Sequence, residues 1–309
     1  MQVSSVGFGA WAIGGNAHGN SYGPTDDAES VRAVRRAVEL GCTFFDTADV
    51  YGWGHSEEML GVALEGHRDS VRIATKVGGD FYHGGVRMNL DPGYIAFALE
   101  RSLRRLRTDH VDLYQLHNPP IDLMGDPRTY EVFDHLKSEG KALHVGVSIH
   151  EPVEGLVVAE TGKASAIQVP FNVFRQEWTD EVLPEAAARG LGVVAREPLA
   201  NGFLAGRISP DRVFPSGDIR NHWPRSMVAA RVEAVRRMAL FLGREGQTMA
   251  QAAIRFVLAS SEVSVAIPGA KTVSQVEENM AAAEGGLTPD ELARLREMHA
   301  RGFKSGENS

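Results

Sequence analysis

Short apolar segments alternate with longer amphipathic segments along most of the chain. The short segments are rich in valine and isoleucine, which is typical of buried parallel strands. They predict strands at residues 3–6, 42–46, 71–77, 110–117, 142–148, 166–172, 191–198 and 263–268. Apolar residues at helical spacing predict helices at residues 27–40, 56–64, 92–107, 126–138, 153–159, 180–189, 227–244, 249–259 and 273–283.

Two helix starts are marked by capping residues. Ser56, followed by two glutamates, is expected to cap the helix at residues 56–64. A last helix at residues 288–300 begins with Thr288-Pro289-Asp290-Glu291, which combines a cap, a proline at the first position and a capping-box acid. Glycines after the first strand predict a close approach of the backbone to a ligand or to another strand.

The regular order of strand and helix predicts a parallel sheet, and eight such units favour a closed (β/α)8 barrel, the TIM-barrel fold. An open doubly wound sheet is the alternative, but no Gly-x-Gly-x-x-Gly motif follows the first strand. We expect a single α/β domain over residues 1–309 with an additional C-terminal helix. Residues 302–309 are polar and are expected to form a disordered tail.

The composition is that of a soluble globular protein, with 43% hydrophobic and 23% charged residues. The only cysteine, Cys42, excludes an internal disulfide and favours a reducing compartment, so we expect a cytoplasmic protein. The net charge of −8 argues against a nucleic-acid partner. No signal peptide and no apolar run of about 18 residues is present, which argues against a membrane protein. A monomer or a homo-oligomer is expected.

Polar side chains gather at the carboxyl ends of the predicted strands, where barrels place their active sites. These residues are Asp46, Lys76, His117, Ser148 and Gln168, and Tyr51 follows in the loop after the second strand. Each alone has a structural explanation, such as a lysine that extends to solvent. Several ionisable groups at the same end of consecutive strands favour catalysis instead.

The four ionisable groups are suited to proton transfer. A tyrosine hydroxyl has an ordinary pKa near 10 and needs help to act near neutrality. The ammonium of Lys76 would lower the pKa of Tyr51, and Asp46 would hold Lys76 in place. His117 would orient a carbonyl oxygen. Because none of these side chains carries a hydride, the chemistry requires a redox cofactor, and we expect no metal.

A phosphate site is predicted after the last strand. Barrels often bind phosphate in the loops after strands seven and eight, at a helix N-terminus. Here Gly269 permits a close approach, and Lys271 and Thr272 supply a charge and a donor. An ordinary capped helix start is the alternative interpretation.

Several motifs together identify a family. They are Phe44-Phe45-Asp46-Thr47-Ala48 with Tyr51-Gly52, Ala74-Thr75-Lys76, Leu116-His117, Gly146-Val147-Ser148, Gln168 with Phe171-Asn172, and Ile267-Pro268-Gly269 with Glu278-Asn279. With these motifs, residues 7–298 resemble the aldo-keto reductase superfamily, and its microbial members most closely. The resemblance implies NADP as the cofactor, a small carbonyl or alcohol as the substrate, and a catalytic tetrad of Asp46, Tyr51, Lys76 and His117, with Tyr51 as the general acid.

The resemblance also implies ligand contacts. Ser148 and Gln168 would hold the nicotinamide carboxamide, Leu199 and Asn201 would lie along the pyrophosphate, and Lys271 would bind the 2′-phosphate. The full set of implied cofactor contacts is Ala10, Trp11, Asp46, Ser148, Gln168, Arg196, Pro198, Leu199, Asn201, Gly269, Lys271, Gln275, Glu278 and Asn279. Substrate contacts are implied at Trp11, Tyr51, Trp53 and His117.

The chain departs from the family pattern at three places. Ile149 stands where the family usually has an asparagine, and Arg196 stands where an aromatic residue usually contacts the nicotinamide, so its flat guanidinium would stack there instead. Relatives also carry an N-terminal hairpin that plugs the barrel floor, and this chain begins near the end of that hairpin. We therefore expect a floor that is covered differently or left open.

The substrate and two other functions stay open. Trp11, Trp53, Phe81, Tyr82 and Trp223 would form an aromatic pocket or would pack the loops together, and residues 199–225 would gate the site. Besides a carbonyl reductase, the chain could be a slow or non-enzymatic regulatory subunit, since potassium-channel β-subunits share this fold and tetrad. The third interpretation is a phosphate-binding isomerase or lyase, which leaves the tetrad unexplained.

Overall fold

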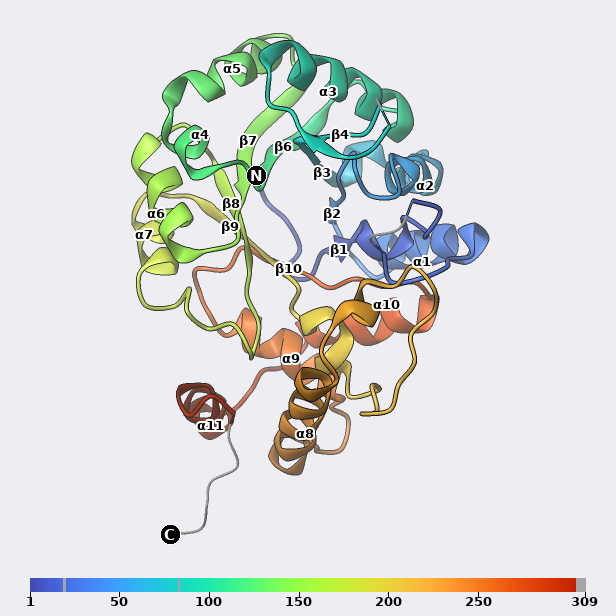
Figure 1. The fold of residues 1–309 in the computed structure, drawn as a ribbon, viewed down its shortest axis with the longest axis vertical. Coiled ribbons are helices and arrows are strands. Elements are labelled where there is room, and N and C mark those ends of the chain that lie inside the picture. The colour runs from blue at the N-terminus through green and yellow to red at the C-terminus, as the bar shows by residue number, and fades with distance from the viewer. Residues whose placement is uncertain (19–20, 83, 304–309) are drawn as a thin grey trace.

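Eight parallel strands form the centre of the protein (Figure 1). The computed structural model describes residues 1–18, 21–82 and 84–303. The strands, in the order in which they neighbour each other, are β1 (Phe8–Gly9), β2 (Phe44–Asp46), β3 (Arg72–Val77), β6 (Val111–His117), β7 (Ala142–Ser148), β8 (Ala166–Pro170), β9 (Gly192–Arg196) and β10 (Val265–Ile267). Parallel bridges from Val6 to Ala266 and from Gly9 to Gly269 join the two ends of the sheet. The predicted barrel is confirmed.

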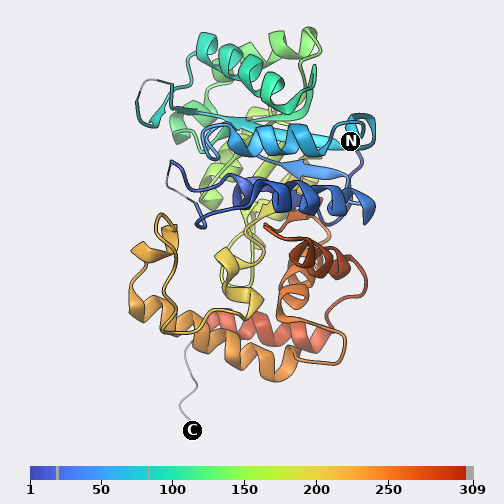
Figure 2. The ribbon, with the colours of Figure 1, turned by 90° about the vertical axis from the view of Figure 1, so that its right-hand side faces the viewer.

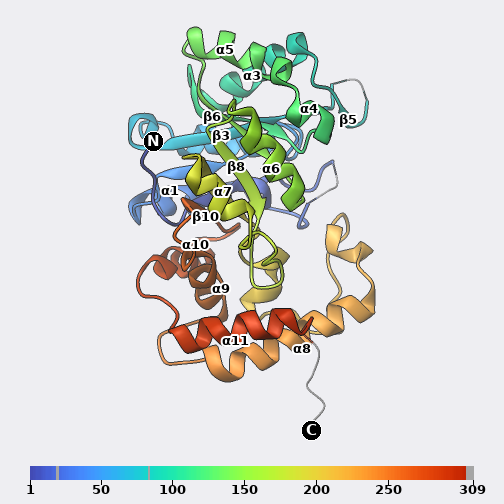
Figure 3. The same cartoon turned by 90° about the vertical axis from the view of Figure 1, so that its left-hand side faces the viewer.

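Helices surround the strands (Figure 1). They are α1 (Asp27–Glu39), α2 (His55–Ala63), α3 (Pro92–Leu106), α4 (Ile121–Gly125), α5 (Glu131–Ser138), α6 (Pro152–Thr161), α7 (Val182–Ala188), α9 (Met249–Leu258) and α10 (Val273–Met280). Two further helices, α8 (Arg225–Leu242) and α11 (Pro289–Ala300), lie side by side outside this ring (Figures 2 and 3). Among the described residues, none of the helices has the length and apolar character needed to cross a bilayer.

Short elements complete the fold. A two-stranded antiparallel hairpin pairs β4 (Gly79–Asp80) with β5 (Arg87–Met88) in the loop after β3. Short 3-10 segments occur at η1 (Ala10–Ile13), η2 (Arg68–Ser70), η3 (Pro127–Tyr130), η4 (Ala200–Ala205), η5 (Ile219–His222) and η6 (Ala281–Ala283), of which η4 is kinked at Asn201 and Gly202. The helix predicted at residues 126–138 is therefore a 3-10 turn followed by α5.

The two-residue period of the strands positions the polar residues. A cluster of buried apolar residues takes members from six of the eight strands: Phe44, Ala74, Leu113, Ala166, Val194, Val265 and Ile267. Residues two positions apart in a strand point to the same face. Asp46, Lys76 and Gln168 each stand two residues after a member of this cluster, so they lie one layer higher in the barrel. The barrel interior thus has an apolar layer beneath a polar layer.

The first strand lies later in the chain than predicted. The sequence indicated a strand at residues 3–6, whereas β1 is Phe8–Gly9. A Cβ atom on Gly7 would lie 2.9 Å from the carbonyl oxygen of Phe44, and one on Gly9 would lie 2.8 Å from that of Ile267. These glycines therefore permit the close approach of neighbouring strands, which closes the barrel.

The predicted cap of α2 is wrong. The helix begins at His55 after Gly54, whose φ of 98° is left-handed and favours glycine. The hydroxyl of Ser56 instead donates to the carbonyl oxygen of Ala10 at 2.8 Å and lies 2.9 Å from the hydroxyl of Thr47. Ser56 thereby ties α2 to the loops after β1 and β2.

The C-terminal end was predicted to be disordered over residues 302–309. Residues 304–309 lie outside the described part of the chain. The ring of Phe303 packs edge-on against Phe174, with 4.9 Å between the centroids, and its carbonyl oxygen accepts a hydrogen bond from Arg237. The described chain therefore remains packed against the molecule up to Phe303.

Candidate active site

A buried lysine connects three strand-end groups. The ammonium of Lys76 donates to Asp46 Oδ1 at 2.6 Å, to the carbonyl oxygen of Thr47 at 2.8 Å and to the hydroxyl of Tyr51 at 3.1 Å. These three acceptors use all three donors of the ammonium. Lys76 is fully buried, so its position and direction are fixed. The structure thus brings together three members of the predicted tetrad.

His117 completes the group. Its ring lies edge-on to that of Tyr51, with 5.7 Å between the centroids and 82° between the planes. Burial, assisted by the positive charges of Lys76 and Arg196, lowers the pKa of His117 well below its ordinary value. The imidazole is therefore neutral at physiological pH.

Burial also governs the pKa values of the tyrosine and the lysine. Burial raises the pKa of Tyr51 more than the neighbouring Lys76 lowers it. Burial lowers the pKa of Lys76, whereas the neighbouring Asp46 and Tyr51 raise it. The effect of these two neighbours is larger, so the pKa of Lys76 is raised overall. Lys76 lowers the pKa of Tyr51, as expected. The expectation that this pKa is lowered overall is wrong, because burial has the larger effect. Tyr51 keeps its proton and Lys76 keeps its charge.

Amide side chains surround the second oxygen of Asp46. This Oδ2 accepts hydrogen bonds from Gln168 Nε2 at 2.7 Å and from Gln115 Nε2 at 3.2 Å. The other end of the Gln168 amide, Oε1, is buried and has no hydrogen-bond partner in the described part of the chain. A buried acceptor without a partner is costly, so Gln168 is suited to receive a donor from a ligand.

Above these groups lies a cavity of about 680 Å³. Most of the predicted site residues line it: Trp11, Asp46, Tyr51, His117, Ser148, Gln168, Arg196, Pro198, Leu199, Asn201, Gly269, Lys271, Gln275, Glu278 and Asn279. Three predicted residues do not. Lys76 lies beneath Tyr51, Ala10 is buried with its carbonyl bound to Ser56, and Trp53 stacks between His18 and Phe81.

The loop aromatics mostly pack the loops together. Trp53 lies 4.1 Å from His18 and 5.7 Å from Phe81 between ring centroids, and Trp223 stacks on Phe203 at 5.2 Å. Of the five aromatic residues proposed for a substrate pocket, only Trp11 lines the cavity. The wall beside Tyr51 and His117 also includes the polar Asn118, His150 and Glu197.

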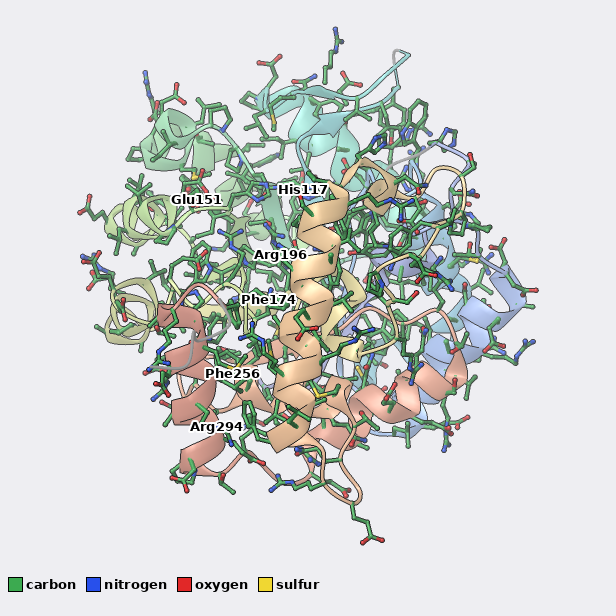
Figure 4. All side chains as sticks on the ribbon, turned by 60° about the horizontal axis from the view of Figure 1, so that its bottom comes forward. His117, Glu151, Phe174, Arg196, Phe256 and Arg294 are labelled. Atoms are coloured by element: carbon green, nitrogen blue, oxygen red, sulfur yellow. The ribbon has the colours of Figure 1, made fainter. Side chains whose placement is uncertain are left out.

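The two residues that differ from the family pattern, Ile149 and Arg196, have different surroundings. Ile149 is fully buried in the main hydrophobic core and is absent from the cavity lining. Arg196 lines the cavity, and one of its amino groups donates to the carbonyl oxygen of Ile149 at 3.1 Å and lies 2.9 Å from His150 Nδ1. It also pairs with Glu197. These contacts fix the plane of the Arg196 guanidinium. Figure 4 labels Arg196 and His117 on the ribbon.

Sequence reasoning missed several cavity residues. They are Tyr22, Asn118, His150, Glu197, Arg207, Arg212, Phe214 and Arg220. Most stand in loops, where no periodic pattern indicates the direction of a side chain. Asn118 had a usable signal, because it directly follows His117 and precedes two prolines that end the strand.

The chain is similar to known proteins over nearly its whole length. The model of the aldo/keto reductase family matches residues 5–300. The chain is 33% identical over 283 residues to aldo-keto reductase YhdN of Bacillus subtilis (strain 168), an alignment that covers 90% of this chain and 84% of that protein.

Solved structures are similar over nearly the whole chain. The glycerol dehydrogenase AKR11B4 from Gluconobacter oxydans has a TM-score of 0.82 and 30% identity, with 99% of this chain and 94% of that chain covered. An aldo-keto reductase from Klebsiella pneumoniae in complex with NADPH has a TM-score of 0.72 and 28% identity, covering 96% of this chain and 91% of that chain. The match to the family model and the identity to YhdN show that the chain belongs to the aldo/keto reductase family.

Proposed function

We propose that this protein is an NADP-dependent oxidoreductase that reduces an aldehyde or ketone to an alcohol, and that the reaction is reversible. The observation that carries the proposal is the ammonium of Lys76, held between Asp46 and the hydroxyl of Tyr51. This arrangement lies below a cavity that Tyr51 and His117 both line.

Tyr51 is the general acid. Reduction of a carbonyl produces an alkoxide, which must receive a proton as it forms. Because burial raises the pKa of Tyr51, the hydroxyl retains its proton until this strong base appears. The ammonium of Lys76, 3.1 Å away, then stabilises the phenolate that remains. In the oxidation direction the same phenolate takes the proton from the alcohol.

His117 orients the carbonyl. A neutral imidazole can donate one N–H to the substrate oxygen without protonating it, and the low pKa of His117 keeps it neutral. The rings of His117 and Tyr51 lie edge-on with 5.7 Å between their centroids, and both residues line the cavity. The substrate oxygen is therefore held by two donors, of which only Tyr51 transfers its proton.

The residues that line the cavity fit a nicotinamide cofactor. The unpartnered Oε1 of Gln168 would accept from the carboxamide nitrogen, and the hydroxyl of Ser148 lies on the same wall. When bound, NADPH supplies the hydride that no side chain can supply. The Klebsiella relative in complex with NADPH supports this cofactor assignment.

The variant Tyr51→Phe tests the proposal. We expect kcat/KM for the reduction of simple aldehydes to fall by at least about 100-fold, because the phenyl ring cannot donate a proton. The Kd for NADPH, measured by fluorescence quenching, is expected to stay unchanged.

Tyr130→Phe is the matched control. This variant also removes one buried phenol, whose hydroxyl donates to the carbonyl oxygen of Met124 at 2.8 Å, and Tyr130 does not line the cavity. Its activity should equal that of the wild type. Retention of more than about a tenth of the activity by Tyr51→Phe, or an equal loss of NADPH binding, would contradict the assigned role.

A further inference from the structure

Gln115, in β6, stands in the polar layer of the barrel interior. It follows Leu113, a member of the apolar layer, by two residues. Its partners in register are Lys76 of β3 and Gly146 of β7. The side chain of Gln115 is fully buried and does not line the cavity. A Cβ atom on Gly146 would lie 3.1 Å from Cγ of Gln115, so this glycine leaves the room that the glutamine occupies.

The side chains of Asp46, Gln115 and Gln168 form a triangle of hydrogen bonds. Asp46 Oδ2 accepts from Nε2 of both glutamines, at 2.7 Å from Gln168 and at 3.2 Å from Gln115. The third side joins the two glutamines, since Gln168 Nε2 donates to Gln115 Oε1 at 3.4 Å. Because all three residues are buried, these contacts determine how each amide is turned.

The ion pair of Asp46 sets the direction of both amides. Its carboxylate pairs with the ammonium of Lys76 through Oδ1 at 2.6 Å, and a carboxylate only accepts hydrogen bonds. Both glutamines therefore turn their NH2 groups toward Oδ2. The NH2 group of Gln168 has two hydrogens, for which Asp46 and Gln115 supply one acceptor each. Only Oε1 of Gln168 is left for a ligand, and it has no partner in the described part of the chain.

Gln115 disfavours the opposite orientation of the Gln168 amide. If that amide were reversed, its oxygen would face Asp46 Oδ2 and Gln115 Oε1, and three acceptors would be buried together without a donor between them. A buried acceptor that has no donor is costly. Gln168 is therefore held as an acceptor toward the cavity, and the ligand atom that meets it must be a donor.

We propose that Gln115 is a positioning residue which, together with Asp46, holds Gln168 as a hydrogen-bond acceptor and so selects a cofactor ring that carries an N–H donor. Asp46 then has two tasks, because the same carboxylate fixes the ammonium of Lys76 and the amide of Gln168. This inference rests on the proposed function, since it requires that a nicotinamide dinucleotide binds in the cavity.

A cofactor analogue tests the acceptor in the wild-type protein. In the 3-acetylpyridine analogue of NADPH a methyl group replaces the carboxamide NH2, so the analogue offers Gln168 no donor. We expect its Kd, measured by fluorescence quenching on the full chain, to be about tenfold or more above that of NADPH, because Oε1 stays buried without a partner. Equal Kd values would overturn the inference without the use of any variant. If the wild type binds neither dinucleotide, the proposed function itself fails, and that result is distinct from equal binding.

The variant Gln115→Met removes the amide and keeps the length of the side chain. It should raise the Kd for NADPH about three- to tenfold and leave that for the analogue unchanged, since the analogue makes no use of Oε1. In a Gln168→Met background the same change should have no further effect on the Kd for NADPH. Gln176→Met is the matched control, because Gln176 is a buried glutamine that does not line the cavity, and its Nε2 donates to the carbonyl oxygens of Val173 and Leu295. It should change neither value.

The other outcomes contradict the role of Gln115. If Gln115→Met raises both Kd values by the same factor, Gln115 supports the barrel as a whole and does not position Gln168. If Gln115→Met changes neither value, or if its effect on NADPH persists in the Gln168→Met background, the amide of Gln168 is not held through Gln115.

Discussion

The side-chain amide of Asn118 contacts Ser148, whereas Ile149, the residue after Ser148, has no amide to offer. The φ of Asn118, 52°, is left-handed, a region that asparagine tolerates better than most residues. Its N–H donates to the carbonyl oxygen of Ser148 at 3.0 Å, and its Oδ1 accepts from the Ser148 hydroxyl at 3.1 Å. Ile149, where the family pattern has an amide, is buried in the core. We infer that the Asn118 amide orients the hydroxyl of Ser148.

Two variants of Asn118 isolate this effect. Asn118→Gly keeps the left-handed backbone accessible and removes only the amide, so we expect a Kd for NADPH about five- to tenfold higher, equivalent to about 1 kcal/mol. Asn118→Ala should weaken binding similarly and also lower the free energy of unfolding by about 1 kcal/mol, because alanine lacks the short polar side chain that lets asparagine tolerate positive φ. Binding titrations and thermal unfolding measure the two effects. Wild-type NADPH binding by Asn118→Gly would show that the amide has no such role.

At the scale of elements, capping determines where several helices begin. Three helices have a complete capping box, formed by Glu151 and Glu154 in α6, Thr248 and Gln251 in α9, and Thr288 and Glu291 in α11. In α11 the hydroxyl of Thr288 accepts from the N–H of Glu291 at 3.2 Å, and Glu291 Oε2 accepts from the N–H of Thr288 at 2.7 Å. This helix packs along α8, outside the barrel, so its cap affects stability without touching the site (Figure 3).

Thr288→Ala should lower the free energy of unfolding by about 1 kcal/mol, since it leaves an N–H of the first turn without its acceptor. Thr288→Ser retains the hydroxyl and should restore most of that loss. Chemical denaturation of the three proteins measures the difference, and NADPH titration serves as the control because neither change reaches the cavity. Equal stabilities for the alanine and serine variants would argue against the cap.

At the scale of the whole molecule, burial of histidines couples stability to pH. Burial is the largest cause that lowers the pKa of His117, of His144 and of His150. Each is neutral when folded and takes up a proton near its ordinary pKa of about 6.5 when unfolded. The unfolded state then binds more protons, so the contribution to stability is present above about pH 6.5 and is lost as the pH falls.

We expect the urea midpoint of the wild type to decrease between pH 7.5 and pH 5.5. The loss from His117 is at most about 1.4 kcal/mol for each pH unit below about 6.5, and the more exposed His144 and His150 contribute less. His117→Gln should therefore show a shallower decrease. His67→Gln, which removes an exposed histidine, is the control and should follow the wild type. Identical pH dependence in all three proteins would refute the coupling.

Local patterns were enough to predict the barrel and to assign Asp46, Lys76 and His117 to the same end of it. Val and Ile runs are recognisable strands in any context, and strand ends of a parallel barrel converge on one rim, so Asp46, Lys76 and His117 were predictable as neighbours. The first strand was misplaced because Gly7 and Gly9 resemble a loop until the neighbouring strands are present. Ser56 was assigned to a helix cap because its partners, Ala10 and Thr47, are distant in the sequence.

The sequence by itself therefore determined the order of elements, the barrel and the identity of the strand-end groups, since these depend on periodicity within short segments. Only the tertiary structure decided which donors remain available. Lys271 has a suitable charge for a phosphate, yet three carbonyl oxygens from residues 22–24 occupy its ammonium. Arg212 gave no local signal, yet it lines the cavity. The physical reason is that the partners of a side chain in a loop come from distant segments, which only the folded chain brings together.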